Sequence, residues 1–261
     1  MNYIDLHSHL AWDIDDGISS VEDCQRLLSV AHKDHIEKIV ATPHLICGKH
    51  DAQDIVLFEN RIKELKELAQ DYGIEIYKGS ELFLNDMLFQ NLNTKQLMPI
   101  ADSRYVLCEF NVRKQYDEDY ELITDYLYEI TVAGYIPILA HVERYFRERI
   151  VLSSIKNLVD MGCYMQMNTS SILYPKSQTM KKNIFDLLNH NLVNIIATDS
   201  HHYKGNRSPN MDAAYTYLCK HFDKTNLEKL FYQNPLAVIS DTEISATNFK
   251  KHILSARRFF K

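Results

Sequence analysis

The chain has 261 residues, of which 46% are hydrophobic and 25% are charged, a balance that excludes extensive disorder and is ordinary for a globular protein. The length fits one large α/β domain as well as two smaller ones. The net charge of -6 argues against a surface that holds a nucleic-acid backbone, so we expect no nucleic-acid partner. Twelve histidines are an unusually high number for this length.

The N-terminal segment lacks the basic and apolar regions of a signal peptide, and no run of about 18 apolar residues occurs. We therefore expect a cytoplasmic protein without membrane insertion. The five cysteines contain no C-x-x-C pair and are predicted to be buried as small apolar groups. None has an arginine six positions later, which excludes the loop of cysteine-based phosphatases. They are Cys24, Cys47, Cys108, Cys163 and Cys219.

In chain order, short β-branched and aromatic runs alternate with stretches of helical period, as expected for repeated βα units around a parallel sheet. Seven strands are predicted, at residues 3–6, 38–41, 75–78, 105–108, 136–140, 164–167 and 194–197. Amphipathic helices are predicted between them, at 21–33, 55–72, 119–133, 153–161 and 180–190. We expect left-handed helix caps at Gly73, Gly134 and Gly162.

The last stretch, residues 246–261, predicts a basic amphipathic helix. It fits a terminal helix packed on the barrel or a contact with a partner, and the oligomeric state stays open. No linker or repeat interrupts the chain, so we expect residues 1–261 to form a single domain.

Six of the seven predicted strands run directly into a histidine or a carboxylate. In a parallel barrel the carboxyl ends of all strands meet at one rim, so these side chains are predicted to lie together. His7 and His9 stand two residues apart in an extended chain, and both imidazoles can therefore reach one ion. Asp199 and His201 repeat this spacing after the last strand.

Glu81 and Glu109 follow apolar strands, where an isolated carboxylate is costly unless a cation neutralises it. No lysine accompanies them, so a metal ion is the expected counter-charge. The site offers nine ligands, too many for one ion, and fits two or three divalent metals, with manganese, iron, zinc and cobalt all suited to the ligand types. The nine are His7, His9, Asp16, His44, Glu81, Glu109, His141, Asp199 and His201.

The remaining histidines lie in predicted helices or loops away from the strand ends, and we expect them at the surface. They are His32, His35, His50, His190, His221 and His252. His202 is a weaker candidate ligand, because its side chain should point away from that of His201.

Arg144 and Arg207 lie close in sequence to His141 and to the pair formed by Asp199 and His201. A guanidinium can hold two phosphate oxygens at once, so arginines beside a multimetal site indicate a phosphoester substrate. A water activated by the metals would attack phosphorus in line, without a cysteine or serine nucleophile. A histidine not fully engaged by metal could protonate the departing oxygen, and the candidates are His44 and His201.

Five segments in order are IDLHSH (4–9), DIDDG (13–17), AHVERY (140–145), MGCY (161–164) with Gln166 and Asn168, and ATDSH (197–201). Together they resemble the bacterial manganese-dependent protein-tyrosine phosphatases of the PHP (polymerase and histidinol phosphatase) superfamily, which act in capsule and exopolysaccharide synthesis. The resemblance implies a distorted seven-stranded β/α barrel and a three-metal site, with the phosphorylated tyrosine-rich tail of a bacterial tyrosine kinase as substrate. It also implies the nine ligands above, including Asp16, which the strand argument places poorly, and phosphate binding by Arg144 and Arg207.

Two segments depart from the pattern of that family. PHLIC (43–47) lacks the basic residues expected after His44, and NRSP (206–209) is looser than the usual arginine-proline run. These loops border the mouth of the site, so the recognised peptide stays open. The alternatives are another phosphoesterase of the superfamily, acting on histidinol phosphate or nucleotide ends, and a kinase-binding scaffold whose metal site is only structural.

Overall fold

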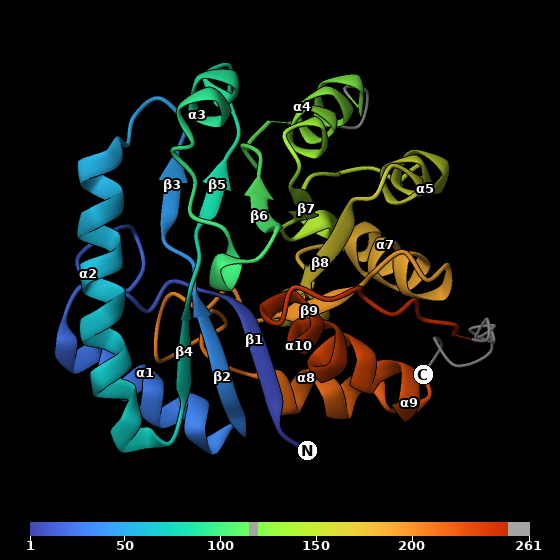
Figure 1. Ribbon diagram of the computed structural model, residues 1–261. Helices are drawn as coiled ribbons and strands as arrows, with labels where there is room; N and C mark the ends of the chain where they lie inside the picture. Colours follow the sequence, from blue (N-terminus) through green and yellow to red (C-terminus); the bar gives the residue numbers. More distant parts are fainter. Residues whose placement is uncertain (115–119, 250–261) are drawn as a thin grey trace.

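Parallel strands form the middle of the molecule, and helices surround them (Figure 1). The computed structural model describes residues 1–114 and 120–249. Its nine strands within these residues are β1 (Tyr3–Ser8), β2 (Ile36–Ala41), β3 (His44–Ile46), β4 (Glu75–Lys78), β5 (Glu81–Phe83), β6 (Tyr105–Glu109), β7 (Ile136–Leu139), β8 (Tyr164–Asn168) and β9 (Ile195–Ala197).

The strands form a three-stranded sheet, β1-β2-β4, and a six-stranded sheet, β3-β5-β6-β7-β8-β9. The prediction of seven strands missed β3 and β5, which continue β2 and β4 after short breaks. Pro43 lies in the first break and has no N–H for a ladder. Gly79 lies in the second, where a Cβ would be 2.7 Å from Cγ1 of Val40. The N–H of Glu81 donates to the Pro43 carbonyl at 3.1 Å and links the two continuations.

The first strand and the last strand meet directly. Ser8, the last residue of β1, forms a parallel bridge with Ser200, which follows β9. The N–H of His9 donates to the Ser200 carbonyl at 2.9 Å, and the N–H of Asp199 donates to the His7 carbonyl at 2.8 Å. These contacts join the three-stranded sheet to the last strand of the six-stranded sheet at their carboxyl ends.

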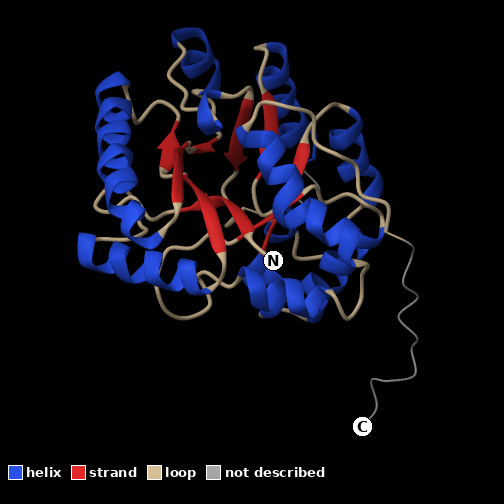
Figure 2. Ribbon diagram, turned by 60° about the horizontal axis from the view of Figure 1, so that its bottom comes forward, coloured by secondary structure: helices blue, strands red, loops and turns tan. Residues whose placement is uncertain are grey.

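Helices cover the outside of the strands (Figure 2). They are α1 (Val21–Lys33), α2 (Ala52–Ala69), α3 (Leu88–Thr94), α4 (Tyr120–Val132), α5 (Leu152–Asp160), α6 (Thr169–Leu173), α7 (Gln178–Asn189), α8 (Met211–Leu218), α9 (Lys224–Glu228) and α10 (Asn234–Ile239), with the 3-10 turns η1 (Gln70–Tyr72), η2 (Ile100–Asp102) and η3 (Val142–Arg144) and the π-helical η4 (Lys229–Gln233). The five predicted helices correspond to α1, α2, α4, α5 and α7. Among the described residues, no helix is long and apolar enough to span a membrane.

Local signals explain where several helices begin and end. The Ser20 hydroxyl accepts a backbone N–H at the start of α1, and Asp51 forms a capping box at the start of α2. The predicted left-handed caps are confirmed, with φ of 65° at Gly73, 89° at Gly134 and 97° at Gly162. These glycines let each helix stop and the chain turn toward the next strand.

An apolar cluster fills the space inside the strands. Ile4, Leu6, Leu107, Ile138 and Ile195 belong to it, and η2 and α10 also contribute side chains. A larger cluster packs the helices on the outer faces of the strands. Burying an aliphatic side chain of this size stabilises the fold by about 1.5–3 kcal/mol, so the strands form a rigid support for the residues at their carboxyl ends.

Only the first four residues of the predicted C-terminal helix, 246–249, belong to the described part of the chain. Residues 246–249 carry no helix, which differs from the prediction, and residues 250–261 lie outside the described part of the chain. Phe249 is 4% exposed and its ring lies 4.8 Å from that of Phe222, centroid to centroid. Phe249 therefore packs in the core from irregular backbone and not from the predicted helical turn.

Candidate metal centre

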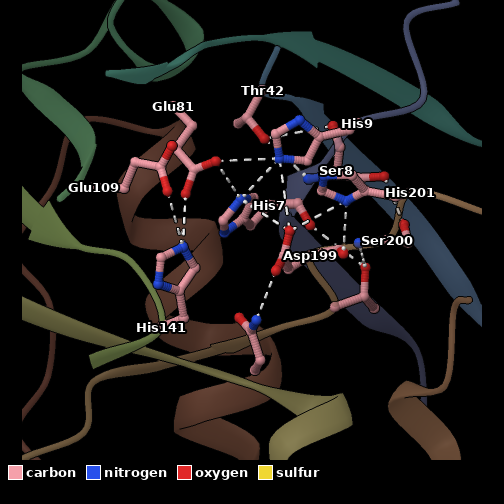
Figure 3. Close-up of polar contacts among 12 residues, drawn as sticks. His7, Ser8, His9, Thr42, Glu81, Glu109, His141, Asp199, Ser200 and His201 are labelled. Carbon is pink, nitrogen blue, oxygen red and sulfur yellow. Dashed lines mark hydrogen bonds and ion pairs between the residues drawn. The ribbon is translucent and has the colours of Figure 1, made fainter. Parts of the chain in front are cut away.

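The carboxyl ends of the strands bring the predicted ligands to one place. Figure 3 shows the imidazoles of His7, His9 and His201 facing the carboxylates of Glu81 and Asp199, although these residues come from three segments at and after the ends of β1 and β9 and at the start of β5. Seven of the nine predicted residues form three overlapping groups whose ligand atoms lie within 4.8 Å of one another. The other two, His141 and Asp199, contact these groups through their side chains.

The first group joins His7, His9 and Glu81, all of them buried. The Nε2 atoms of His7 and His9 are 3.1 Å apart, and Oε2 of Glu81 lies 3.2 Å from each of them. Oδ1 of Asp199 lies 3.5 Å from Nε2 of His7 and 3.6 Å from Nε2 of His9. Two imidazoles and two carboxylates therefore surround one point.

The second group joins His44, Glu81 and Glu109. Nδ1 of His44 lies 3.1 Å from Oε2 of Glu81 and 3.0 Å from Oε1 of Glu109. On the other side, Nε2 of His141 is 2.9 Å from Oε1 of Glu81 and 3.5 Å from Oε2 of Glu109. Glu81 is shared with the first group, so its two oxygens face both positions.

The third group lies nearest to solvent and consists of His9, Asp16, His44 and His201. Oδ1 of Asp16 is 3.3 Å from Nε2 of His44 and 3.5 Å from Nε2 of His201. The Asp16 side chain is 69% exposed. The loop after β1 thus brings Asp16 to the site, a position that strand ends alone did not indicate.

The donor set fits divalent cations. Imidazole nitrogens and carboxylate oxygens are ligands of manganese, iron, zinc and cobalt. Nδ1 of His44 is buried and has no hydrogen-bond partner among the described residues, although two carboxylate oxygens lie close to it. A cation at each group would satisfy such atoms and offset the crowding of Glu81, Glu109 and Asp199.

The electrostatic environment keeps the carboxylates ionised. Burial raises the pKa of Glu81, but the imidazoles of His7 and His141 outweigh it and hold this pKa well below its ordinary value. Asp15, which the sequence argument missed, accepts from the His9 ring, with Oδ2 2.7 Å from Nδ1. Burial opposes the ionisation of Asp15, but His9 outweighs it and lowers the pKa of Asp15 to about 2. The contact turns Nε2 of His9 toward the other ligands.

Two candidate ligands have an unusual backbone. His141 has φ of 36° and Asp199 has φ of 52°, a left-handed conformation that costs a non-glycine residue about 1–3 kcal/mol. Both residues follow a strand end, β7 and β9 respectively. Such strain persists only where surrounding structure holds it, and it often marks functional sites.

The two predicted arginines converge beside the metal ligands. Nη1 of Arg144 lies 3.0 Å from Oδ2 of Asp199, and Nη2 of Arg207 lies 2.9 Å from Oδ1 of the same carboxylate. Nη2 of Arg207 is also 2.8 Å from Nε2 of His201. The side chains are 23% and 37% exposed, so both guanidinium groups lie between the buried ligands and solvent.

Two adjoining cavities open over these groups. One of about 440 Å³ is lined by candidate ligands and by Arg144, Arg207 and Arg113. Another of about 160 Å³ shares Arg144 and Arg207 and extends to Tyr174 and Lys176. Arg113 was not predicted, because its position four residues after Glu109 gives no motif.

The remaining histidines and the cysteines mostly follow the predictions. His32, His35, His190 and His202 are exposed. His50 and His221 are half-buried instead, because their rings pack edge-on against phenylalanines, and His252 lies outside the described residues. Four of the five cysteines are buried and Cys219 is half-buried.

The sequence matches a family described as capsular polysaccharide synthesis, CpsB/CapC, over residues 3–240. The chain belongs to the CpsB/CapC family. Tyrosine-protein phosphatase CpsB of Streptococcus pneumoniae, a relative, is 32% identical over 246 residues, which cover 91% of this chain and 98% of that protein. The resemblance inferred from the five segments is thereby confirmed.

Solved structures support the barrel class of this CpsB/CapC-family chain. One from the pair YwqE of Bacillus subtilis and CpsB of S. pneumoniae, described as unique metal-dependent tyrosine phosphatases, has a TM-score of 0.77 and 24% identity, covering 95% of this chain and 99% of that chain. Histidinol phosphate phosphatase of Lactococcus lactis has a TM-score of 0.55 and 15% identity, covering 84% and 93%. These likenesses show a shared fold and confirm the predicted fold class.

Proposed function

We propose that this CpsB/CapC-family protein is a metal-dependent protein-tyrosine phosphatase. One observation carries the proposal: three overlapping ligand groups line a cavity that also holds Arg144 and Arg207. The proposed ligands are the nine predicted residues, holding two or three divalent ions, manganese first: His7, His9, Asp16, His44, Glu81, Glu109, His141, Asp199 and His201. Membership in a family of capsular polysaccharide synthesis with relatives named tyrosine-protein phosphatases supports the substrate class.

The proposed substrate is the phosphotyrosine of a bacterial tyrosine kinase that controls capsule or exopolysaccharide synthesis. Such a kinase tail would have to reach the site from the cytoplasm, where we place the protein. Residues 1–261 are proposed to act as one domain.

The arginines have the geometry to grip a phosphate. They approach Asp199 from two different loops, so their guanidinium groups flank the same point from two sides. Each can donate two parallel hydrogen bonds to phosphoryl oxygens, which fixes the phosphorus and neutralises charge that develops during displacement. Bound divalent ions supply a nucleophile at neutral pH and Lewis-acid stabilisation of the phosphoryl group.

The leaving group of a phosphotyrosine needs little help from a proton donor. A phenol has a pKa of about 10 and departs more easily than an alkyl alcohol. The proposed proton donor is the one of His44 and His201 that is not fully engaged by metal, and both contact the exposed Asp16 carboxylate. The His44 side chain is 22% exposed and that of His201 is 2% exposed, so His44 lies nearer to an incoming substrate.

A substrate panel tests the proposal. The full chain with added Mn²⁺ would be assayed on a phosphotyrosyl peptide, an aryl phosphate, histidinol phosphate and DNA carrying terminal phosphates, with Arg144→Ala as a matched variant. We expect turnover of the phosphotyrosyl peptide and aryl phosphate that falls in the variant. A strong preference for histidinol phosphate or DNA would establish another phosphoesterase instead. No turnover of any substrate would support a scaffold with a structural metal site.

A further inference from the structure

Strand β8 brings none of the nine proposed ligands to the site, yet it ends among them. Its inward residues Gln166 and Asn168 are 0% and 1% exposed. Their amide groups lie between His7, on β1, and Asp199, after β9. A buried amide pair at this place needs hydrogen-bond partners, and it finds them on two proposed ligands.

The direction of this hydrogen-bond chain is fixed from both ends. The backbone N–H of His141 can only donate, and it lies 2.8 Å from one side-chain atom of Gln166, which must therefore be the oxygen Oε1. At the other end, the Asp199 carboxylate can only accept, and its Oδ2 lies 2.8 Å from Asn168, whose atom there must be the nitrogen Nδ2. Nε2 of Gln166 then donates to Oδ1 of Asn168 at 2.9 Å.

This direction decides which ring nitrogen of His7 carries the proton in the neutral imidazole. Nδ1 of His7 lies 3.2 Å from Oε1 of Gln166, an oxygen that only accepts, so the ring proton is on Nδ1. In the neutral ring with its proton on Nδ1, the lone pair is on Nε2, and this atom faces Nε2 of His9 at 3.1 Å and Oε2 of Glu81 at 3.2 Å. The ring of His7 is thus prepared to bind a cation through Nε2.

The same hydrogen-bond chain turns the Asp199 carboxylate, whose Oδ1 also accepts from Nη2 of Arg207 at 2.9 Å. Oδ2 accepts from Asn168 and from Nη1 of Arg144, at 2.8 and 3.0 Å. Oδ1 consequently faces the imidazoles, 3.5 Å from Nε2 of His7 and 3.3 Å from Nδ1 of His201. One pair of amides thereby orients two ligands from opposite ends of the strand order.

We propose that Gln166 and Asn168 are positioning residues, which lock His7 in the Nδ1–H tautomer and turn Oδ1 of Asp199 toward the first ligand group. His9 has a carboxylate partner, Asp15, in the corresponding place, so the two histidines of this group are held by different chemistry. The neutral amide link holds His7 without adding a further negative charge beside Glu81 and Asp199. This inference rests on the proposed metal binding and not on the choice of phosphoester.

The most direct test reads the tautomer of His7 in the full chain. Protein with ¹⁵N-labelled histidine, loaded with diamagnetic Zn²⁺, would be examined by long-range ¹⁵N–¹H correlation. We expect the proton of His7 on Nδ1 and the metal on Nε2. A proton on Nε2 would overturn the proposal, whatever the enzymatic activity proves to be.

Two near-isosteric variants distinguish the His7 end of the hydrogen-bond chain from its Asp199 end. Gln166→Met removes both links, and we expect mixed His7 tautomers and a loss of Zn²⁺ and Mn²⁺ affinity of about 10–100-fold in competition with a chelator. Asn168→Leu breaks only the Asp199 end, so His7 should keep its proton on Nδ1 while metal affinity falls by a similar factor. The Asn168 side chain makes no capping hydrogen bond to α6, so its loss should leave that helix intact.

Asn183→Leu is the matched control. Asn183 is equally buried and bonds to backbone groups of Glu148 and Ile150, away from the proposed ligands. This variant should lose stability without changing the His7 tautomer or metal affinity. Unchanged affinity in both Gln166→Met and Asn168→Leu would overturn the proposal, and if either variant fails to fold, the tautomer of the unmutated chain decides.

Discussion

Glu81 is the carboxylate on which the proposed metal centre depends most. It belongs to two of the three ligand groups, and its oxygens lie 2.9–3.2 Å from nitrogens of His7, His9, His44 and His141. Glu81→Gln keeps the shape of the side chain and removes its charge, so both groups lose their shared anion. We expect the bound metal to fall by one or two ions per chain.

The loss of activity follows from the role of the ions. A metal that stabilises phosphoryl charge contributes several kcal/mol, and a loss of about 4 kcal/mol corresponds to about a thousandfold in rate. Metal content would be measured by elemental analysis and kcat on an aryl phosphate at saturating Mn²⁺. Glu75→Gln, at an exposed carboxylate on β4, is the control and should leave both unchanged. Full metal content with kcat within about threefold of the unmutated chain would refute the shared role of Glu81.

Three further predictions concern other parts of the structure. Arg144→Ala and Arg207→Ala should each lower kcat/KM for an aryl phosphate by about 10–100-fold, the worth of a charged hydrogen-bond pair, and unchanged kcat/KM would remove them from phosphate binding. Iodoacetamide should leave activity intact, because burial raises the pKa of the Cys108 thiol well above its ordinary value. Among the described residues, no thiol lines the metal cavity. Rapid inactivation by iodoacetamide would contradict this prediction. Leu107→Ala inside the strands should cost about 2–5 kcal/mol in urea unfolding, and a smaller loss than about 1 kcal/mol would mean that the cluster is loosely packed.

The order of strands and helices could be predicted from the sequence, but the interruptions after β2 and β4 could not. The predicted strands coincide with regular strands because β-branched runs and glycine caps are local signals. The prediction missed β3 and β5 because each is only three residues long and follows a longer strand after a break of two residues. At the end of the described chain, the sequence did not show that Phe249 is buried while residues 246–249 form no helix.

The site was predictable to the extent that parallel strands end together. That rule places His7, Glu81 and Asp199 at one rim from their positions in the chain alone. Asp16 needed the family resemblance, because it lies on a loop whose course depends on contacts that no local pattern encodes. Asp15 was missed, since the sequence cannot show which of two adjacent carboxylates faces His9.

The roles of Gln166 and Asn168 also could not be predicted from the sequence. Polar residues at alternate positions of a buried strand indicate an inward polar face, but not its partners. Only the assembled strands bring Gln166 beside His7 and Asn168 beside Asp199, residues separated by 159 and 31 positions.

Metal dependence of turnover tests the central claim most directly. The full chain would be stripped with a chelator and then titrated with Mn²⁺, while the initial rate on a phosphotyrosyl peptide and the bound metal are measured in parallel. The proposed mechanism predicts no turnover in the stripped protein and a rate that rises as metal binds, reaching its plateau at two or three ions per chain. Full turnover by the stripped protein would contradict it.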